Sequence, residues 1–512
     1  MQDFDEIIST LAQEKFGIPY LRPFQRLVIS RILEQKDVTD QPEKNQLVVL
    51  PTGSGKSICF QLPALLLQGL TIIVYPLLSL MNDQKQSLDR NSIASVMLKG
   101  GQTNGQRRRI WSELKVGNAR IVITNPETLV SEHVLKRLAE FSIDLFVVDE
   151  AHTVCEWGES FRPAYLRLSQ VTDRLRPRQL IAFTATASQD IMHRLEQLLF
   201  NGKSPHLIMA SPDRQNIRYR LRRSICMEHD IIMLFTHGAA RPAIIFCRTR
   251  RECEDIAWQI RGNCPTIPVQ YYHAGLTKEE REAIEKWFLL STDGVLCATT
   301  AYGMGVSKNN TRTVIHKGLP GGAQAYLQES GRAGRDGKMA DAWVLIDDLS
   351  KKRAGSSEGM MLAFSGENCI RENLLRLMDV DLESDFCCSG CDVCNGRLQP
   401  VPEGRKELEA VIRRFPLRFR IEELAWLISG TRIQPIVQRW DKLDPIYGLL
   451  DNWTQRHLCL ALENLCGTKT VRRVLKGPFK NRLYVSFTHK GRRRSVQSVP
   501  TQTKTIRESP KT

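Results

Sequence analysis

The segment PTGSGKS at residues 51–57 has the composition of a phosphate-binding loop, with two glycines, a lysine and a hydroxyl side chain. It lies between an apolar run and an amphipathic stretch, which is the strand-to-helix setting of such loops. Backbone N–H groups around Gly53 and Gly55 can surround phosphate oxygens. Lys56 can reach the β- and γ-phosphates, and Ser57 can ligate magnesium. The segment therefore predicts a site for ATP and Mg²⁺.

Two carboxylates follow a second apolar run, in the sequence VVDEAH at 147–152. Asp149 suits a contact to the magnesium ion, and Glu150 suits activation of the attacking water. A lone Asp-Glu pair is usually solvated surface. At the end of a buried strand, downstream of a phosphate loop, the pair is better interpreted as the other half of a hydrolytic site.

Positive charge for the γ-phosphate is available in GRAGRDG at 331–337. Arg332 and Arg335 lie three residues apart in a Gly-rich segment. In isolation this would be a basic turn. Together with a phosphate loop and a carboxylate pair, it predicts two arginine fingers that stabilise the transferring phosphoryl group.

Aromatic and basic side chains crowd the segment WGESFRPAY at 157–165, directly after the carboxylates. Aromatic rings interleaved with an arginine suit the faces of unpaired bases. Trp157, Phe161, Arg162 and Tyr165 are therefore predicted to contact single-stranded nucleic acid next to the hydrolytic site.

Four cysteines read C-x18-C-x2-C-x2-C, a spacing that favours a structural zinc site with four thiolate ligands. The predicted ligands are Cys369, Cys388, Cys391 and Cys394. Cys387 leaves an alternative by a slip of one residue, although the even spacing favours Cys388. Most of the other cysteines are scattered singly in apolar stretches and are interpreted as reduced thiols.

Two series of β-branched runs, separated by amphipathic stretches, predict two doubly wound α/β lobes with parallel sheets. The predicted strands of the first lobe lie at 46–51, 71–76, 119–124, 144–149 and 180–185. Those of the second lie at 242–247, 269–274, 294–299, 313–318 and 342–347.

Helical patterns and a basic β-rich segment follow the cysteines. Patterns at 407–414, 421–428 and 453–465, followed by RRVLKGPFKNRLYVSFTH, suggest a winged helix. Residues 401–512 hold 23 Lys+Arg against 10 Asp+Glu, a net of +13 out of +16 for the chain. Such a basic end is typical of a module that binds a polyanion. Arg472, Arg473 and Lys476 are predicted to contact the phosphates of such a polyanion.

The length of 512 residues predicts several domains, and 42% hydrophobic with 25% charged residues is typical of a globular protein. No apolar run is long enough to span a bilayer, so no membrane association is expected. The acidic start, MQDFDEIIST, lacks an export signal, and a cytoplasmic protein is expected, at the nucleoid in a bacterium or nuclear in a eukaryote. The predicted boundaries are 1–205 and 206–347 for the lobes, 348–400 for the zinc segment, 401–490 for the winged helix and 491–512 for a basic disordered tail.

As a set, these segments resemble the superfamily 2 helicases, and within them the RecQ family. The resemblance covers roughly residues 5–398. It rests on FGIPYLRPFQRLVI, PTGSGKS, YPLLSLMNDQ, TNPE, DEAH, WGESFRPAY, FTATAS, YYHAGL, TTAYGMGVSK and QESGRAGRDG, which follow the family's order.

The resemblance implies two RecA-like lobes, a helical zinc-binding subdomain and a winged helix. It implies an ATP-dependent DNA helicase that moves 3′ to 5′ on single-stranded DNA, unwinds forked or junction duplexes and serves DNA repair and recombination. It also implies a short form without the C-terminal HRDC domain, with a single-stranded DNA-binding protein as a candidate partner. Scaffolds that use ATP only as a switch, translocases without strand separation, and RNA helicases are the alternatives.

The resemblance assigns further residues. Gln25 would read the adenine edge, Thr184 and Thr186 would link hydrolysis to lobe movement, and His152 would receive a signal from the DNA-contacting loop. The other residues that it implies for nucleotide binding are Arg22, Thr52, Ser54 and Gln328.

Overall fold

The structure is a computed structural model of the chain. It describes all residues except 1, 35–44, 52, 158–161, 186–188, 303–307, 350–357, 381, 383–385, 431–444, 469 and 486–512. The side chains of residues 2–4, 156 and 157 also lie outside the described part. The chain forms two compact units, residues 1–403 and 404–512.

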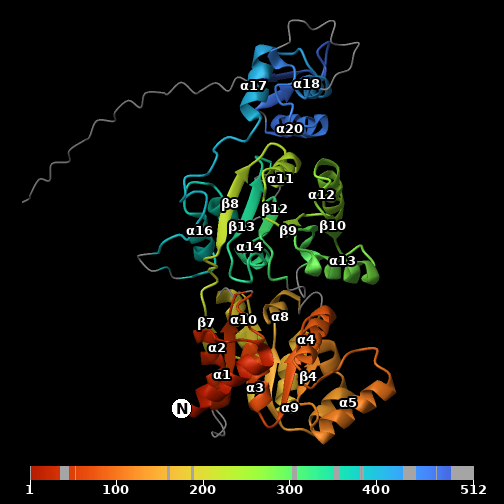
Figure 1. Ribbon diagram of the computed structural model, residues 1–512, viewed down its shortest axis with the longest axis vertical. Coiled ribbons are helices and arrows are strands. Elements are labelled where there is room, and N and C mark those ends of the chain that lie inside the picture. The colour runs from red at the N-terminus through yellow and green to blue at the C-terminus, as the bar shows by residue number, and fades with distance from the viewer. Residues whose placement is uncertain are drawn as a thin grey trace, which may run out of the picture. The chain divides into compact units, whose positions relative to one another are not determined.

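The first lobe is built on a seven-stranded sheet in the order β3-β4-β2-β5-β6-β1-β7, in which every pairing is parallel (Figure 1). Its strands are β1 (Gln46–Val49), β2 (Leu70–Val74), β3 (Ser95–Met97), β4 (Ile121–Thr124), β5 (Ile143–Val148), β6 (Gln179–Thr184) and β7 (His206–Met209). Its helices are α1 (Gln2–Phe16), α2 (Pro23–Glu34), α3 (Ile58–Leu66), α4 (Leu78–Arg90), α5 (Asn104–Val116), α6 (Pro126–Leu129), α7 (Glu132–Leu138), α8 (His152–Trp157), α9 (Leu168–Leu175) and α10 (Gln189–Leu199).

The second lobe has a six-stranded sheet in the order β10-β11-β9-β12-β13-β8, also parallel throughout (Figure 1). Its strands are β8 (Ile217–Arg223), β9 (Ala243–Phe246), β10 (Val269–Tyr272), β11 (Val295–Ala298), β12 (Thr313–Lys317) and β13 (Ala340–Ile346). Its helices are α11 (Met227–Thr236), α12 (Arg250–Asn263), α13 (Lys278–Leu290) and α14 (Ala323–Ser330), followed by α15 (Glu358–Ala363) and α16 (Ile370–Arg376).

Side chains of each sheet alternate between two cores because successive residues of a strand point to opposite faces. In β5, Phe146 and Val148 pack into one core of the first lobe, and Leu145 and Val147 pack into the other. A strand that is buried on both faces has a continuous apolar sequence, which is why it could be predicted from the chain alone. The prediction of two doubly wound parallel-sheet lobes is confirmed.

Helix starts are fixed locally where the sequence provides a cap. Thr277 accepts a hydrogen bond from the backbone N–H of Glu280, whose side chain accepts one from the Thr277 N–H, and this capping box begins α13. Among the described residues, no helix is long and apolar enough to cross a membrane.

The segment that carries the cysteine cluster shares a core with the second lobe. Met360, Phe364 and Leu374 pack in the same buried cluster as Tyr219 and Tyr326. The predicted division at residue 347 therefore does not separate two independent cores in this structure.

Residues 404–512 form a separate small unit. Its described elements are α17 (Arg405–Arg414), α18 (Ile421–Ile428), α20 (Gln455–Gly467) and the antiparallel pair β14 (Val471–Arg473) and β15 (Leu483–Val485). The predicted helices and hairpin are thus present. Their identification as a winged helix stays a prediction, and the predicted tail at 491–512 lies outside the described residues.

Candidate functional site

The carboxyl ends of three neighbouring strands supply the predicted hydrolytic residues. The phosphate loop follows β1, Asp149 follows β5 and Thr184 ends β6, and these strands are adjacent in the order β5-β6-β1. In a parallel α/β sheet this edge is where ligands bind, because the loops that leave neighbouring strands meet there. The topology therefore assembles segments that are far apart in the sequence.

The phosphate loop needs its glycines for conformation and for space. Gly53 and Gly55 have φ angles of +77° and +84°. A Cβ on Gly55 would lie 2.6 Å from Nε2 of Gln25. That amide donates hydrogen bonds of 2.9 and 3.3 Å to the carbonyls of Ser54 and Gly55. Gln25, which the resemblance assigns to the adenine edge, therefore also holds the phosphate loop. Its Oε1 accepts a hydrogen bond of 2.9 Å from the Arg22 N–H.

Lys56, Glu150, His152 and Thr184 form a connected chain of polar side chains. Lys56 Nζ lies 3.2 Å from Glu150 Oε1, and Glu150 Oε2 lies 3.5 Å from His152 Nδ1. That ring nitrogen is 3.1 Å from Thr184 Oγ1, and both His152 and Thr184 are buried. Glu150 has a φ of +49°, a strained value for a residue with a side chain, of the kind found at functional sites.

The two carboxylates differ in their pKa values. Burial, together with the neighbouring negative charge of Glu150, raises the pKa of Asp149 to about 7. Burial also acts to raise the pKa of Glu150, but the positive charge of Lys56, followed by His152, outweighs it and holds that pKa below its ordinary value. Glu150, a carboxylate that stays ionised beside a lysine, can orient and activate water. The buried Asp149 is the carboxylate whose ionised form a bound cation would stabilise most.

The predicted finger arginines lie beside these residues. Arg332 is 5% exposed, and burial lowers its pKa while the charge of Glu150 acts against that lowering. Burial, then the like charge of Arg332, lowers the pKa of Arg335 to about 10. A Cβ on Gly53 would lie 3.2 Å from Cγ of Arg335, so this arginine packs on the phosphate loop. Gln328 lies half-buried on α14, shortly before Arg332.

The predicted DNA-contact loop is described only in part. Phe161 and the side chain of Trp157 lie outside the described residues, as do Thr52 and Thr186 of the other predicted sets. Arg162 is half-buried, donates to the Pro76 carbonyl and lies 3.7 Å from Glu127.

Tyr165 departs from the prediction. Its side chain is 0% exposed and packs in the core of the first lobe, where burial raises the pKa of its hydroxyl. A ring in that position cannot stack on a base, so Tyr165 fixes the end of the loop to the core of the first lobe. In the second unit, Arg472, Arg473 and Lys476 are exposed, as phosphate contacts require.

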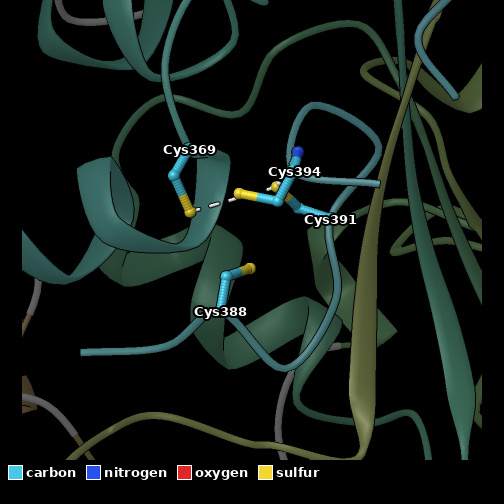
Figure 2. A group of neighbouring side chains, drawn as sticks. All are labelled: Cys369, Cys388, Cys391 and Cys394. Carbon is cyan, nitrogen blue, oxygen red and sulfur yellow. Dashed lines mark hydrogen bonds between the residues drawn. The ribbon is translucent and has the colours of Figure 1, made fainter. Parts of the chain in front are cut away.

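The four predicted zinc ligands come together in one cluster. The Sγ atoms of Cys369, Cys388, Cys391 and Cys394 all lie within 4.8 Å of one another (Figure 2). Tetrahedral coordination with Zn–S bonds of about 2.3 Å requires sulfurs roughly 3.8 Å apart. The Cys391–Cys369 separation is 3.9 Å, so the donor set fits zinc. Cys387 is exposed and outside the cluster, which favours Cys388 over Cys387 as the fourth proposed ligand.

Backbone contacts dock the cysteine loop onto the second lobe. Cys391 pairs with Tyr219 of β8, the edge strand of the sheet, through Tyr219 N–H to Gly390 and Asp392 N–H to Tyr219. Asp392 also accepts from the Leu221 N–H at 3.0 Å. The cluster therefore ties α16, which begins after Cys369, to the free edge of a sheet.

We expect zinc at about one equivalent per chain, because four thiolates close the coordination sphere. The substitution Cys391→Ser should remove the metal and lower the thermal midpoint by about 5 °C or more, since zinc binding contributes folding free energy. The matched control Cys387→Ser should leave both unchanged. Elemental analysis with thermal unfolding checks this, and substoichiometric metal in the unaltered protein would contradict it.

One arginine at the site was missed by the sequence reasoning. Arg214 donates to the carbonyls of Gly331 at 3.4 Å and Gly334 at 2.8 Å, on either side of Arg332. It lies in the connection between β7 and β8, where no recognised motif drew attention to it. Only the fold brings this connection to the phosphate loop.

The sequence of this chain is similar to those of known helicases. The DEAD/DEAH box helicase family matches residues 22–194, and the helicase conserved C-terminal domain matches residues 226–337. ATP-dependent DNA helicase RecQ of Synechocystis is 36% identical over 345 residues, covering 65% of this chain and 69% of the relative. The protein of the same name from Pasteurella multocida is 29% identical over 483 residues, covering 90% of this chain and 74% of the relative.

Solved structures show the same fold. The DEAD-box helicase Mss116, bound to single-stranded RNA and UDP-BeF, has a TM-score of 0.57 at 17% identity and covers 90% of both chains. The DUF1998 helicase MrfA, bound to DNA, has a TM-score of 0.54 at 20% identity, covering 71% of this chain and 56% of that one. Likeness at these identities is likeness of fold alone.

Proposed function

Because this chain belongs to the RecQ family of helicases, we propose that it is an ATP-dependent DNA helicase. In this proposal it moves 3′ to 5′ along single-stranded DNA, separates forked or junction duplexes and serves DNA repair and recombination. The curated relatives that are named as DNA helicases support the choice of DNA over RNA.

One observation carries the proposal. Lys56, Glu150 and Arg332 come from three distant segments, yet Lys56 Nζ is 3.2 Å from Glu150 and the charge of Glu150 acts on Arg332. A cation for the phosphates, a carboxylate for water and a cation for the developing charge are the parts that phosphoryl transfer to water requires.

Each residue has a proposed role in that reaction. Asp149 and Ser57 hold Mg²⁺, which neutralises phosphate charge when it is bound. Lys56 binds the β- and γ-phosphates, and Glu150 orients the attacking water. Arg332 and Arg335 stabilise the transferring group. Arg22, Gln25, Thr52, Gly53, Ser54, Gly55 and Gln328 complete the proposed nucleotide site.

Hydrolysis and DNA binding are proposed to communicate through His152. Its ring lies between Glu150 and Thr184, and it begins α8, which runs to Trp157. A shift of α8 on DNA binding would therefore move the histidine against the water-orienting carboxylate. Trp157, Phe161 and Arg162 are the proposed single-strand contacts.

The proposed division of labour follows the predicted boundaries. Residues 1–205 bind ATP, residues 206–347 supply the fingers, and residues 348–400 hold structural zinc. Residues 401–490 bind duplex DNA through exposed basic side chains that include Arg472, Arg473 and Lys476.

We expect single-stranded DNA to raise the steady-state rate of ATP hydrolysis by at least about tenfold, which corresponds to an activation barrier lowered by roughly 1.4 kcal/mol. Single-stranded RNA of the same sequence should give little stimulation. Phosphate release in the presence of each polymer measures this. Equal stimulation by RNA would contradict the proposed substrate, and hydrolysis independent of any nucleic acid would favour an ATP-switched scaffold.

A further inference from the structure

Arg214 lies against two segments of the proposed nucleotide site, the loop that carries Arg332 and the phosphate loop. Its Nη2 and Nη1 donate to the carbonyls of Gly334 and Gly331, and its Nε donates to Asn216 Oδ1 at 3.3 Å. Asn216 in turn donates to the same Gly334 carbonyl at 2.8 Å. Arg214 and Asn216, which belong to one short segment, therefore bind the loop that carries Arg332 at the carbonyls of its two glycines.

The same guanidinium also lies against the phosphate loop. A Cβ on Gly53 would lie 3.1 Å from Arg214 Nη1, which is closer than an ordinary van der Waals contact. Gly53 thus lies against Arg214 and Arg335 together.

Positive charge accumulates at this place. Burial is the main cause that lowers the pKa of Arg214, and the like charge of Arg22 lowers it further. The charge of Arg214 likewise contributes to the lowered pKa of Arg335. Several guanidinium groups beside a phosphate loop repel one another until an anion binds among them, so the cluster favours a polyphosphate.

The backbone of Arg214 is fixed by a buried arginine on the zinc-bearing segment. Arg371, on α16, is 0% exposed. Its guanidinium carbon lies 4.8 Å from the centroid of the Tyr219 ring. It donates to the Arg214 carbonyl at 3.2 Å, and also to the Asp213 carboxylate and the Ile217 carbonyl. Charge-assisted bonds of this kind, when buried, fix geometry strongly.

We propose that Arg214 is a positioning residue that holds the Gly331–Gly334 loop, and with it Arg332, against the phosphate loop at Gly53. Arg371 fixes the backbone of Arg214 to the helix that follows zinc ligand Cys369. The inference rests on the proposed ATPase function, because it assigns Arg214 a task at that site. Arg214 acts through Arg332 and transfers no group itself.

The test compares steady-state ATP hydrolysis by full-length Arg214→Ala and Arg214→Lys with the control Arg251→Ala, an exposed arginine of α12. We expect Arg214→Ala to lower kcat about 10- to 100-fold, as a misplaced catalytic group does, with KM for ATP changed less than about threefold. Lysine keeps the charge but lacks the rigid planar fork of donors that reaches the Gly331 and Gly334 carbonyls from separate nitrogens, so it should not rescue kcat. The thermal midpoint and the zinc content should match those of the control.

A double-substitution cycle separates positioning from general stability. If Arg214 acts through Arg332, the double variant Arg214→Ala/Arg332→Ala should hydrolyse ATP no more slowly than Arg332→Ala alone. Multiplying effects, full rescue by lysine, or an unchanged kcat in Arg214→Ala would each overturn the proposal. Absence of hydrolysis by the unaltered protein would instead overturn the proposed function, so the two failures are distinguishable.

Discussion

Replacing Arg332 with alanine is expected to lower kcat for DNA-stimulated ATP hydrolysis by about 10³-fold or more, the usual contribution of an arginine finger. The buried guanidinium is close enough to Glu150 for that charge to act on its pKa, so it lies near the carboxylate that is proposed to orient water. Its removal leaves the developing charge on the γ-phosphoryl group without this partner.

Nucleotide binding should change much less than kcat, because the finger acts mainly in the transition state. Binding of a fluorescent ATP analogue and single-turnover phosphate release separate the two quantities. Arg251→Ala is the matched control for the loss of one arginine. A kcat within about threefold of the unaltered protein would remove Arg332 from the proposed mechanism.

The substitution Glu150→Gln is expected to lower the rate of hydrolysis by about 10²- to 10⁴-fold, the range for loss of a general base. The amide has nearly the same shape and its oxygen can still accept from Lys56, which now lies 3.2 Å from Oε1. The loop geometry should therefore persist while the negative charge that orients and activates water is lost.

ATP binding by Glu150→Gln should be retained, and the thermal midpoint should stay within a few degrees of the unaltered protein. The comparison with Asp149→Asn is informative, since that change should weaken Mg²⁺ binding and so raise the Mg²⁺ concentration that hydrolysis requires. Hydrolysis by Glu150→Gln within about tenfold of the unaltered protein would show that another group activates the water.

The strands that are buried on both faces were predictable because their apolar runs are continuous. The three strands missed by the sequence reasoning are β3, β7 and β8. β3 has only three residues, and β7 lies at a sheet edge with Leu207 and Met209 exposed. These short or half-exposed segments lack the apolar run that a fully buried strand provides.

β8 was missed for a different reason. Its sequence, IRYRLRR, alternates apolar and basic residues, and three of its four arginines (Arg218, Arg220 and Arg222) pair with acidic side chains outside the strand. Arg220, for example, pairs with Asp341 at 3.1 Å and with Asp392 at 2.6 Å. The period of two was a usable strand signal, but the partners that make so basic a strand stable were not visible in the sequence.

The candidate site was predictable where short motifs fix the chemistry, as in the phosphate loop and the cysteine spacing. Residues whose position depends on tertiary packing were not. Tyr165 belongs to the predicted DNA-contact loop yet lies in the core. Arg214 lies beside Gly53 only because the fold brings the connection between β7 and β8 next to the phosphate loop. Spacing along the chain carries no information on either arrangement.

In the proposed mechanism, hydrolysis at the Lys56–Glu150–Arg332 site drives separation of DNA strands. The most direct test is strand displacement from a fluorophore-labelled duplex with a 3′ single-stranded tail, with ATP and Mg²⁺, by the unaltered protein and by Glu150→Gln in parallel. We predict displacement by the unaltered protein, none by Glu150→Gln, and little from the same duplex with a 5′ tail. Equal displacement by both proteins, or rapid DNA-stimulated hydrolysis without displacement from either tail, would contradict the claim.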